Sequence, residues 1–136
     1  MIKTDAQRER TAVQIDGFRK ASAKAEAETS GKRVAAIRGS YEGMIRQLEH
    51  ELNEYDQLKS GNFALPTIER LDQIPPFIVR LRIAKGVSQT ELAARLGVSK
   101  QVISRYEEDE YQGAAIVRIQ EILDSLGVRT AILLSA

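Results

Sequence analysis

The stretch that decides the fold, residues 87–107, reads VSQTELAARLGVSKQVISRYE. Ser88 and Ser99 are each followed by a helix-forming segment, and serine is a favoured N-cap residue. Gly97 lies between the two segments, where a left-handed helix stop is expected. The pattern therefore predicts two short helices, at 89–96 and at about 100–108.

The side chains within this stretch suit two helices that cross at close range. A helix-turn-helix needs a small residue where the helices meet, which is Ala93, and a positive φ in its turn, which glycine accepts at Gly97. Its inner face must be apolar. Five residues supply that face: Leu92, Leu96, Val98, Ile103 and Tyr106. The spacing predicts a helix-turn-helix.

This stretch resembles the Cro and phage-repressor type of helix-turn-helix, the XRE family. The resemblance covers about Ile74 to Gly127. It implies an all-α, lambda-repressor-like DNA-binding domain of four or five helices, with the helix from Ser99 to Glu108 as the recognition helix. It also implies an ion pair between Arg82 and Glu107 that ties the first helix to the end of the recognition helix.

The resemblance also assigns contacts with double-stranded DNA. Lys100, Gln101 and Arg105 match base-reading positions, and these side chain types can pair with guanine or adenine edges. Gln89 matches a position that contacts phosphate and braces the recognition helix, and its backbone N–H lies at a helix N-terminus, which favours a phosphate oxygen. The full set of expected DNA-binding residues is Gln89, Thr90, Ser99, Lys100, Gln101, Ser104 and Arg105.

An acidic run departs from the family pattern. Glu107 to Glu110 are four consecutive carboxylates, and Tyr111 follows them. Carboxylates near phosphates weaken DNA binding. The run is similar to the antitoxin branch of the family, of the HigA type, whose partners are basic toxins. A small basic toxin protein is therefore a candidate partner.

The segments around the motif are expected to complete the domain. A first helix is predicted from Pro76 to Lys85 and a fourth from Ala114 to Leu126, each ending before a glycine. Val128 to Leu134 is apolar and β-branched, so a short C-terminal strand is predicted there, paired with residues 62–65. The expected DNA-binding domain spans residues 74–136, after a linker at 62–73.

Residues 1–61 are expected to form a helical segment, because helix-forming residues dominate and proline is absent. Apolar residues in its second half recur every three and four positions, with Glu51 as one polar member. Such a series is typical of a coiled coil. It could close an intrachain hairpin broken at Gly31, or pair with a second chain. The expected dimerisation residues are Val34, Ile37, Tyr41, Met44, Leu48, Tyr55 and Leu58.

Composition excludes several functions. The 136 residues include no cysteine, and the net charge of +1 gives no global support for binding nucleic acid. His50 is the only histidine and has no second ligand at metal-binding spacing. No catalytic set, metal or cofactor is expected, so the protein is not expected to be an enzyme. The charged start and the lack of a long apolar run predict a cytoplasmic, nucleoid-associated protein with no membrane partner.

Together these patterns predict a sequence-specific transcriptional regulator, a repressor that reads the major groove as a homodimer on a pseudo-palindromic operator. Two alternatives remain open. The chain could be an antitoxin that binds a basic toxin and represses its own operon, or a protein-interaction module that keeps the fold without binding DNA.

Overall fold

The structure, a computed structural model, describes residues 1–136 and divides into two compact units, Met1–Gln57 and Leu58–Ala136. Helices are the only regular secondary structure, which confirms the predicted all-α class. The six α-helices are α1 (Asp5–Glu28), α2 (Lys32–Lys59), α3 (Ile78–Ala84), α4 (Gln89–Leu96), α5 (Lys100–Glu108) and α6 (Ile116–Ser125).

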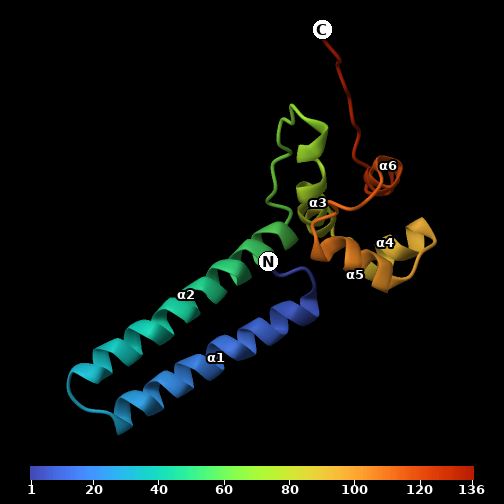
Figure 1. Ribbon diagram of the computed structural model, residues 1–136. Helices are drawn as coiled ribbons and strands as arrows, with labels where there is room; N and C mark the ends of the chain where they lie inside the picture. Colours follow the sequence, from blue (N-terminus) through green and yellow to red (C-terminus); the bar gives the residue numbers. More distant parts are fainter. The chain divides into compact units, whose positions relative to one another are not determined.

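The first unit is a helical hairpin in which α1 and α2 run antiparallel (Figure 1). The chain reverses at Gly31, whose φ of +76° lies in the left-handed region that glycine adopts without strain. Polar contacts bridge the two helices along their length. Arg8 Nε and Nη2 donate to Asp56 at 2.9 and 3.0 Å, and the Tyr55 hydroxyl donates to Asp5 at 2.7 Å.

The apolar series of α2 meets α1 within the same chain, so the hairpin alternative is the one observed. The rings of Tyr41 and Phe18 lie 6.1 Å apart between centroids. Tyr55 is buried and Met44 is exposed, and most other members of the series are half-buried. Ion pairs of Arg38 with Glu26 and of Arg19 with Glu49 flank the apolar contact. Much of the stripe predicted for dimerisation is therefore used inside one chain.

The second unit holds α3 to α6 around one apolar core. Ile78 of α3, Leu92 of α4, Ile103 of α5 and Ile122 of α6 are each fully buried. Helix α4 packs on both α5 and α6, and Arg95 Nη1 on α4 donates to the Ser125 carbonyl at 2.8 Å. Each of these four helices therefore contributes at least one fully buried aliphatic side chain to the core.

Three local predictions need correction. The prediction of a C-terminal strand at Val128–Leu134 is wrong, because residues 128–136 have no regular secondary structure and residues 62–65 form no partner strand. A strand requires a hydrogen-bonded neighbour, which this chain does not provide.

The two outer helices of the domain are shorter than predicted. Two 3₁₀ turns, Leu71–Gln73 and Pro75–Phe77, precede α3, so this helix begins at Ile78 instead of Pro76. The prolines lack backbone N–H groups and occupy the turn before the helix. Helix α6 begins at Ile116 and ends at Ser125, inside the predicted limits. Among all the helices of the structure, none is both long enough and apolar enough to span a bilayer.

Candidate nucleic-acid interface

The geometry of α4 and α5 follows from a few capping residues. The Ser88 hydroxyl accepts from the Glu91 N–H at 3.0 Å and begins α4, and the Ser99 hydroxyl accepts from the Val102 N–H at 3.4 Å and begins α5. Gly97 ends α4 with φ +68° and ψ +30°, a left-handed conformation in which a side chain would be strained. The caps and the glycine fix a three-residue turn.

The residues at the centre of the contact between α4 and α5 are fully or almost fully buried. Leu92 and Ile103 have no exposed surface, and Ala93 is 3% exposed. The small Ala93 lets α5 approach α4, because a larger side chain there would hold the two helices apart. Three residues at the edges of the face are half-buried: Leu96, Val98 and Tyr106.

The outer face of α5 is polar and free of partners. Lys100, Gln101 and Arg105 are exposed, and their side chains make no hydrogen bond or ion pair within the chain. Ser104 is half-buried beside them, and Ser99 is exposed where the helix begins. Donor groups that bind nothing inside the protein are available to an external ligand.

Gln89 and Thr90, the residues expected to contact phosphate, have different surroundings. Thr90 is exposed, whereas Gln89 is only 6% exposed. The Gln89 side chain amide donates to Glu107 Oε1 at 2.9 Å. Gln89 therefore braces the end of α5 with its side chain, which leaves little of that side chain to reach DNA.

Glu107 is the centre of a buried polar network. The Arg82 guanidinium donates from Nε to Oε2 and from Nη2 to Oε1, both at 2.7 Å, which is a bidentate geometry. Arg82 also donates to the Val87 carbonyl at 2.8 Å. Both charged side chains are almost fully enclosed, at 3% and 0% exposure. The network joins α3 and the start of α4 to the end of α5.

Tyr111 is a further member of this network, and its place there is not predicted by the sequence pattern. Its hydroxyl donates to Glu107 Oε2 at 3.0 Å, and its ring stacks on Tyr106 at 5.6 Å between centroids. Glu110 and Tyr111 have φ of +56° and +62°, so the chain folds back sharply after α5. Burial, with the nearby Glu107 charge, raises the pKa of Tyr111. The only sign of this role in the sequence is that a tyrosine follows α5 within a few residues.

The acidic run is divided by this turn. Glu107 points into the core, whereas Glu108, Asp109 and Glu110 are exposed. The negative charge near α5 therefore comes from three carboxylates, because the fourth is matched by Arg82.

Replacing Tyr111 with phenylalanine is expected to lower the free energy of unfolding by about 1–3 kcal/mol at pH 7, because Glu107 loses a buried donor. The raised pKa adds a pH dependence. A phenol that ionises less readily in the folded state stabilises the fold below the unfolded pKa of about 10, and that contribution is lost as the pH rises further. Urea unfolding of both proteins between pH 7 and 11 should show the difference shrinking above pH 10. A constant difference would contradict the assignment.

The comparison with protein families agrees with this geometry. Residues 78–133 match the family model described as helix-turn-helix. No curated protein and no solved structure matched the chain. The match spans α3 to α6 and most of the C-terminal tail, and it does not extend to the hairpin. Residues 78–133 are therefore similar to helix-turn-helix domains, the kind of domain that the sequence pattern predicted for this stretch.

Proposed function

We propose that this protein is a sequence-specific transcription regulator that inserts α5 into the major groove of double-stranded DNA. The observation that carries the proposal is the division of α5 into two faces. Ile103 and Glu107 on one face are fully buried, whereas Lys100, Gln101 and Arg105 are exposed and have no partner in the chain. Lysine and arginine can donate to guanine, and glutamine can pair with adenine.

The supporting contacts have separate roles in this proposal. Thr90 lies in the first turn of α4 and Ser99 is the N-cap of α5, and both are exposed. Backbone N–H groups at the start of a helix favour phosphate oxygens. Gln89 and Ser104 are proposed to position α5 more than to read bases, since each is at least half-buried. Phosphate contacts of this kind fix the register of the helix on DNA without carrying sequence information.

The regulator is proposed to act as a homodimer and as a repressor. One module of this size buries too little surface to reach the affinity of a specific regulator. Two copies related by a two-fold axis would place their recognition helices about 34 Å apart, one turn of DNA. A dimer bound across a promoter would block transcription by occupancy.

Selection of bound fragments from random double-stranded DNA, at a fixed salt concentration, tests the proposal. The expected result is an inverted repeat whose half-site centres lie about one helical turn apart. Absence of any enriched sequence would reject sequence-specific binding and would favour the alternative of an interaction module that keeps the fold.

Arg105→Ala is expected to weaken binding to the selected operator by about 1–3 kcal/mol and to relax the preference at one base position. The exposed side chain has no partner in the chain, so the substitution should leave the fold intact. Titration of operator variants with both proteins measures the two effects. Arg118→Ala is a matched control, because Arg118 pairs with Glu121 on α6, outside α5. Unchanged operator affinity for Arg105→Ala would contradict the role of Arg105.

One observation favours the antitoxin alternative. Glu108, Asp109 and Glu110 are exposed together at the end of α5, where they would repel DNA but attract a basic protein. In that case a small basic protein encoded by the adjacent gene should co-purify with the full chain, and replacement of the three residues by their amides should release it.

A further inference from the structure

The half of the hairpin that contains the turn carries a strong positive charge. Residues 17–40, the end of α1 and the start of α2, contain six lysines and arginines and only two acidic residues. The rest of the hairpin, residues 1–16 and 41–57, contains four basic and eight acidic residues. We call residues 17–40 the basic tip. The hairpin is therefore polarised along its length, with its basic end where the chain reverses (Figure 1).

Half of the basic residues of the tip have no partner within the chain. Three of them form ion pairs with carboxylates of the hairpin: Arg19 with Glu49, Lys20 with Asp16, and Arg38 with Glu26. The other three, Lys24, Lys32 and Arg33, are exposed and make no hydrogen bond or ion pair. These three cations stabilise no other part of the hairpin, so they are available to an external anion.

The surroundings of the three cations favour an anion over an apolar partner. The exposed large hydrophobic side chains of the hairpin lie outside the basic tip, at Met1, Val13 and Met44. Within the tip, small residues such as Ala27 and Ala36 are exposed between the charges. Protein interfaces and membrane surfaces need apolar anchors, which the tip lacks. Phosphate contacts need only accessible positive charge.

The length of the basic tip suits a polymer of phosphates. Residues 17–28 of α1 extend over about 18 Å, at 1.5 Å for each helical residue. Duplex DNA carries one negative charge for every 1.7 Å or so, so an equal length of duplex presents about ten phosphates. Each of the three unpaired cations therefore has several phosphates within reach, whatever the base sequence.

We propose that the basic tip binds the phosphate backbone of double-stranded DNA, without reading its sequence, in addition to the contact made by α5. This inference rests on the proposed function, because the choice of DNA among polyanions follows from the helix-turn-helix in the same chain. Once α5 is bound, the tethered hairpin meets DNA at an effective concentration on the order of millimolar. A few weak ionic contacts then add to the affinity.

The chain between the tip and the second unit is long enough for a separate contact. Helix α2 has 28 residues and is therefore about 42 Å long. Residues 62–70 contain no helix or strand and span at most about 30 Å. One turn of DNA measures about 34 Å, so the tip can bind backbone outside the bases that one α5 reads.

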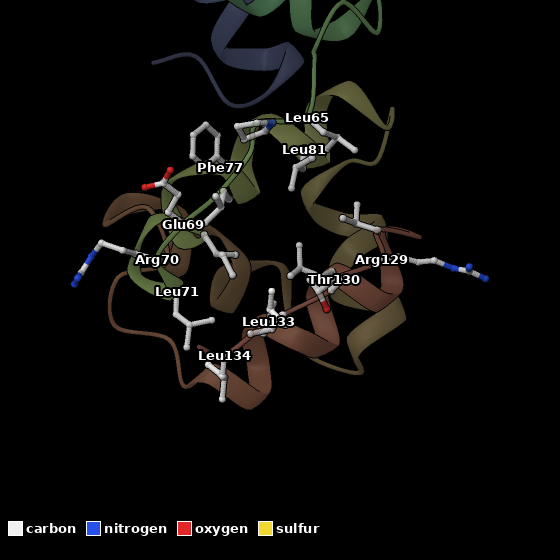
Figure 2. A pocket seen from close by; sticks show the side chains of 17 residues that line it. Leu65, Glu69, Arg70, Leu71, Phe77, Leu81, Arg129, Thr130, Leu133 and Leu134 are labelled. Carbon is white, nitrogen blue, oxygen red and sulfur yellow. The ribbon is translucent and has the colours of Figure 1, made fainter. Parts of the chain in front are cut away.

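Another surface without an internal role, in the second unit, does not suit the same ligand. A hollow of about 320 Å³ is lined largely by aliphatic residues, among them Leu65, Leu81 and Leu133. Figure 2 shows that Arg70 and Arg129, at its margin, point away from it. An aliphatic hollow does not stabilise a buried phosphate charge. The basic tip is therefore the better candidate for binding a polyanion.

The salt dependence of DNA binding by the full chain tests the proposal. The probe is a duplex that extends two helical turns beyond the selected operator on each side. Replacing Lys24 and Arg33 together by glutamine should lower the slope of log Kd against log salt by about 2, because two phosphate contacts are lost. At about 0.1 M salt, binding should weaken about 10-fold or more, with the base preference unchanged. Circular dichroism should be unchanged, since both side chains are exposed.

The rest of the hairpin provides a matched control. Arg10 and Arg46 are also exposed and unpaired, but both lie outside the basic tip. The double variant Arg10→Gln with Arg46→Gln removes the same net charge, so it should leave the slope and the affinity unchanged. An equal loss in this control would show a general effect of net charge and would overturn the proposal.

A cleavage experiment tests whether the tip touches DNA, using a chain that has no natural cysteine. Ser30 is exposed beside the turn, so Ser30→Cys can carry an iron chelate that generates hydroxyl radicals. With the protein held on its operator, this reagent should cut the backbone at discrete positions. The cuts should disappear when Ser30→Cys is combined with Lys24→Gln and Arg33→Gln under conditions where α5 still saturates the operator.

The outcomes separate this proposal from the proposed function. Operator binding with an unchanged salt slope in the Lys24→Gln, Arg33→Gln variant, or with no cleavage from position 30, would overturn the role of the tip and leave the reading of DNA by α5 intact. If no operator is selected, the proposed function fails, and the same salt series on a duplex of arbitrary sequence tests the tip. A slope lowered by about 2 would then support it, and equal slopes would overturn it.

Discussion

Glu107→Ala is expected to remove about 3–5 kcal/mol from the free energy of unfolding of the second unit. The substitution leaves the Arg82 guanidinium enclosed at 3% exposure without its counter-charge. It also removes the acceptor of Gln89 and of Tyr111. Since small domains are stable by only about 5–15 kcal/mol, the variant should be close to unfolding at 25 °C. Urea unfolding followed by circular dichroism measures the loss.

The neighbouring carboxylate provides the control for this prediction. Glu108 is exposed, so Glu108→Ala should change the stability by no more than about 0.5 kcal/mol. A double variant with Arg82→Met and Glu107→Leu should recover much of the lost stability, because a packed apolar pair can replace a buried ion pair. A loss below about 1 kcal/mol in Glu107→Ala would show that the network contributes little.

The sequence predicted the helix-turn-helix well because its determinants are local. Ser88 and Ser99 cap the helices that directly follow them, and Gly97 adopts the left-handed stop expected of it. The Arg82–Glu107 ion pair could be predicted only from the resemblance to the repressor family, because the two residues lie 25 positions apart in the sequence. Local signals determine where helices begin and end, whereas a buried network also depends on which helix ends meet.

The remaining differences also arise from partners that local patterns cannot identify. The heptad series of α2 predicted an apolar contact, but it does not specify whether that contact is α1 or another chain. The tail after α6 has the composition of a strand and has no strand partner within the chain. Tyr111 reaches Glu107 only because two consecutive residues adopt positive φ, a conformation that is uncommon outside glycine.

Simultaneous replacement of Lys100, Gln101 and Arg105 by alanine is expected to reduce operator binding to the level of non-specific DNA, a loss of about 1,000-fold or more. All three side chains are exposed and unpaired, and alanine favours helix, so the variant should fold at least as stably as the wild type. Operator titration and urea unfolding of the same preparation measure the two quantities separately.

Separate measurements of operator binding and of folding stability distinguish the proposed functions. Glu107→Ala should weaken DNA binding only as far as it unfolds the domain, whereas the triple variant should lose recognition while remaining folded. If the triple variant instead regulates transcription normally, α5 does not read DNA and the fold serves as an interaction module. If specific binding is lost but the acidic run still retains a basic partner protein, the antitoxin alternative gains support, because DNA and protein would then be bound through different residues of one motif.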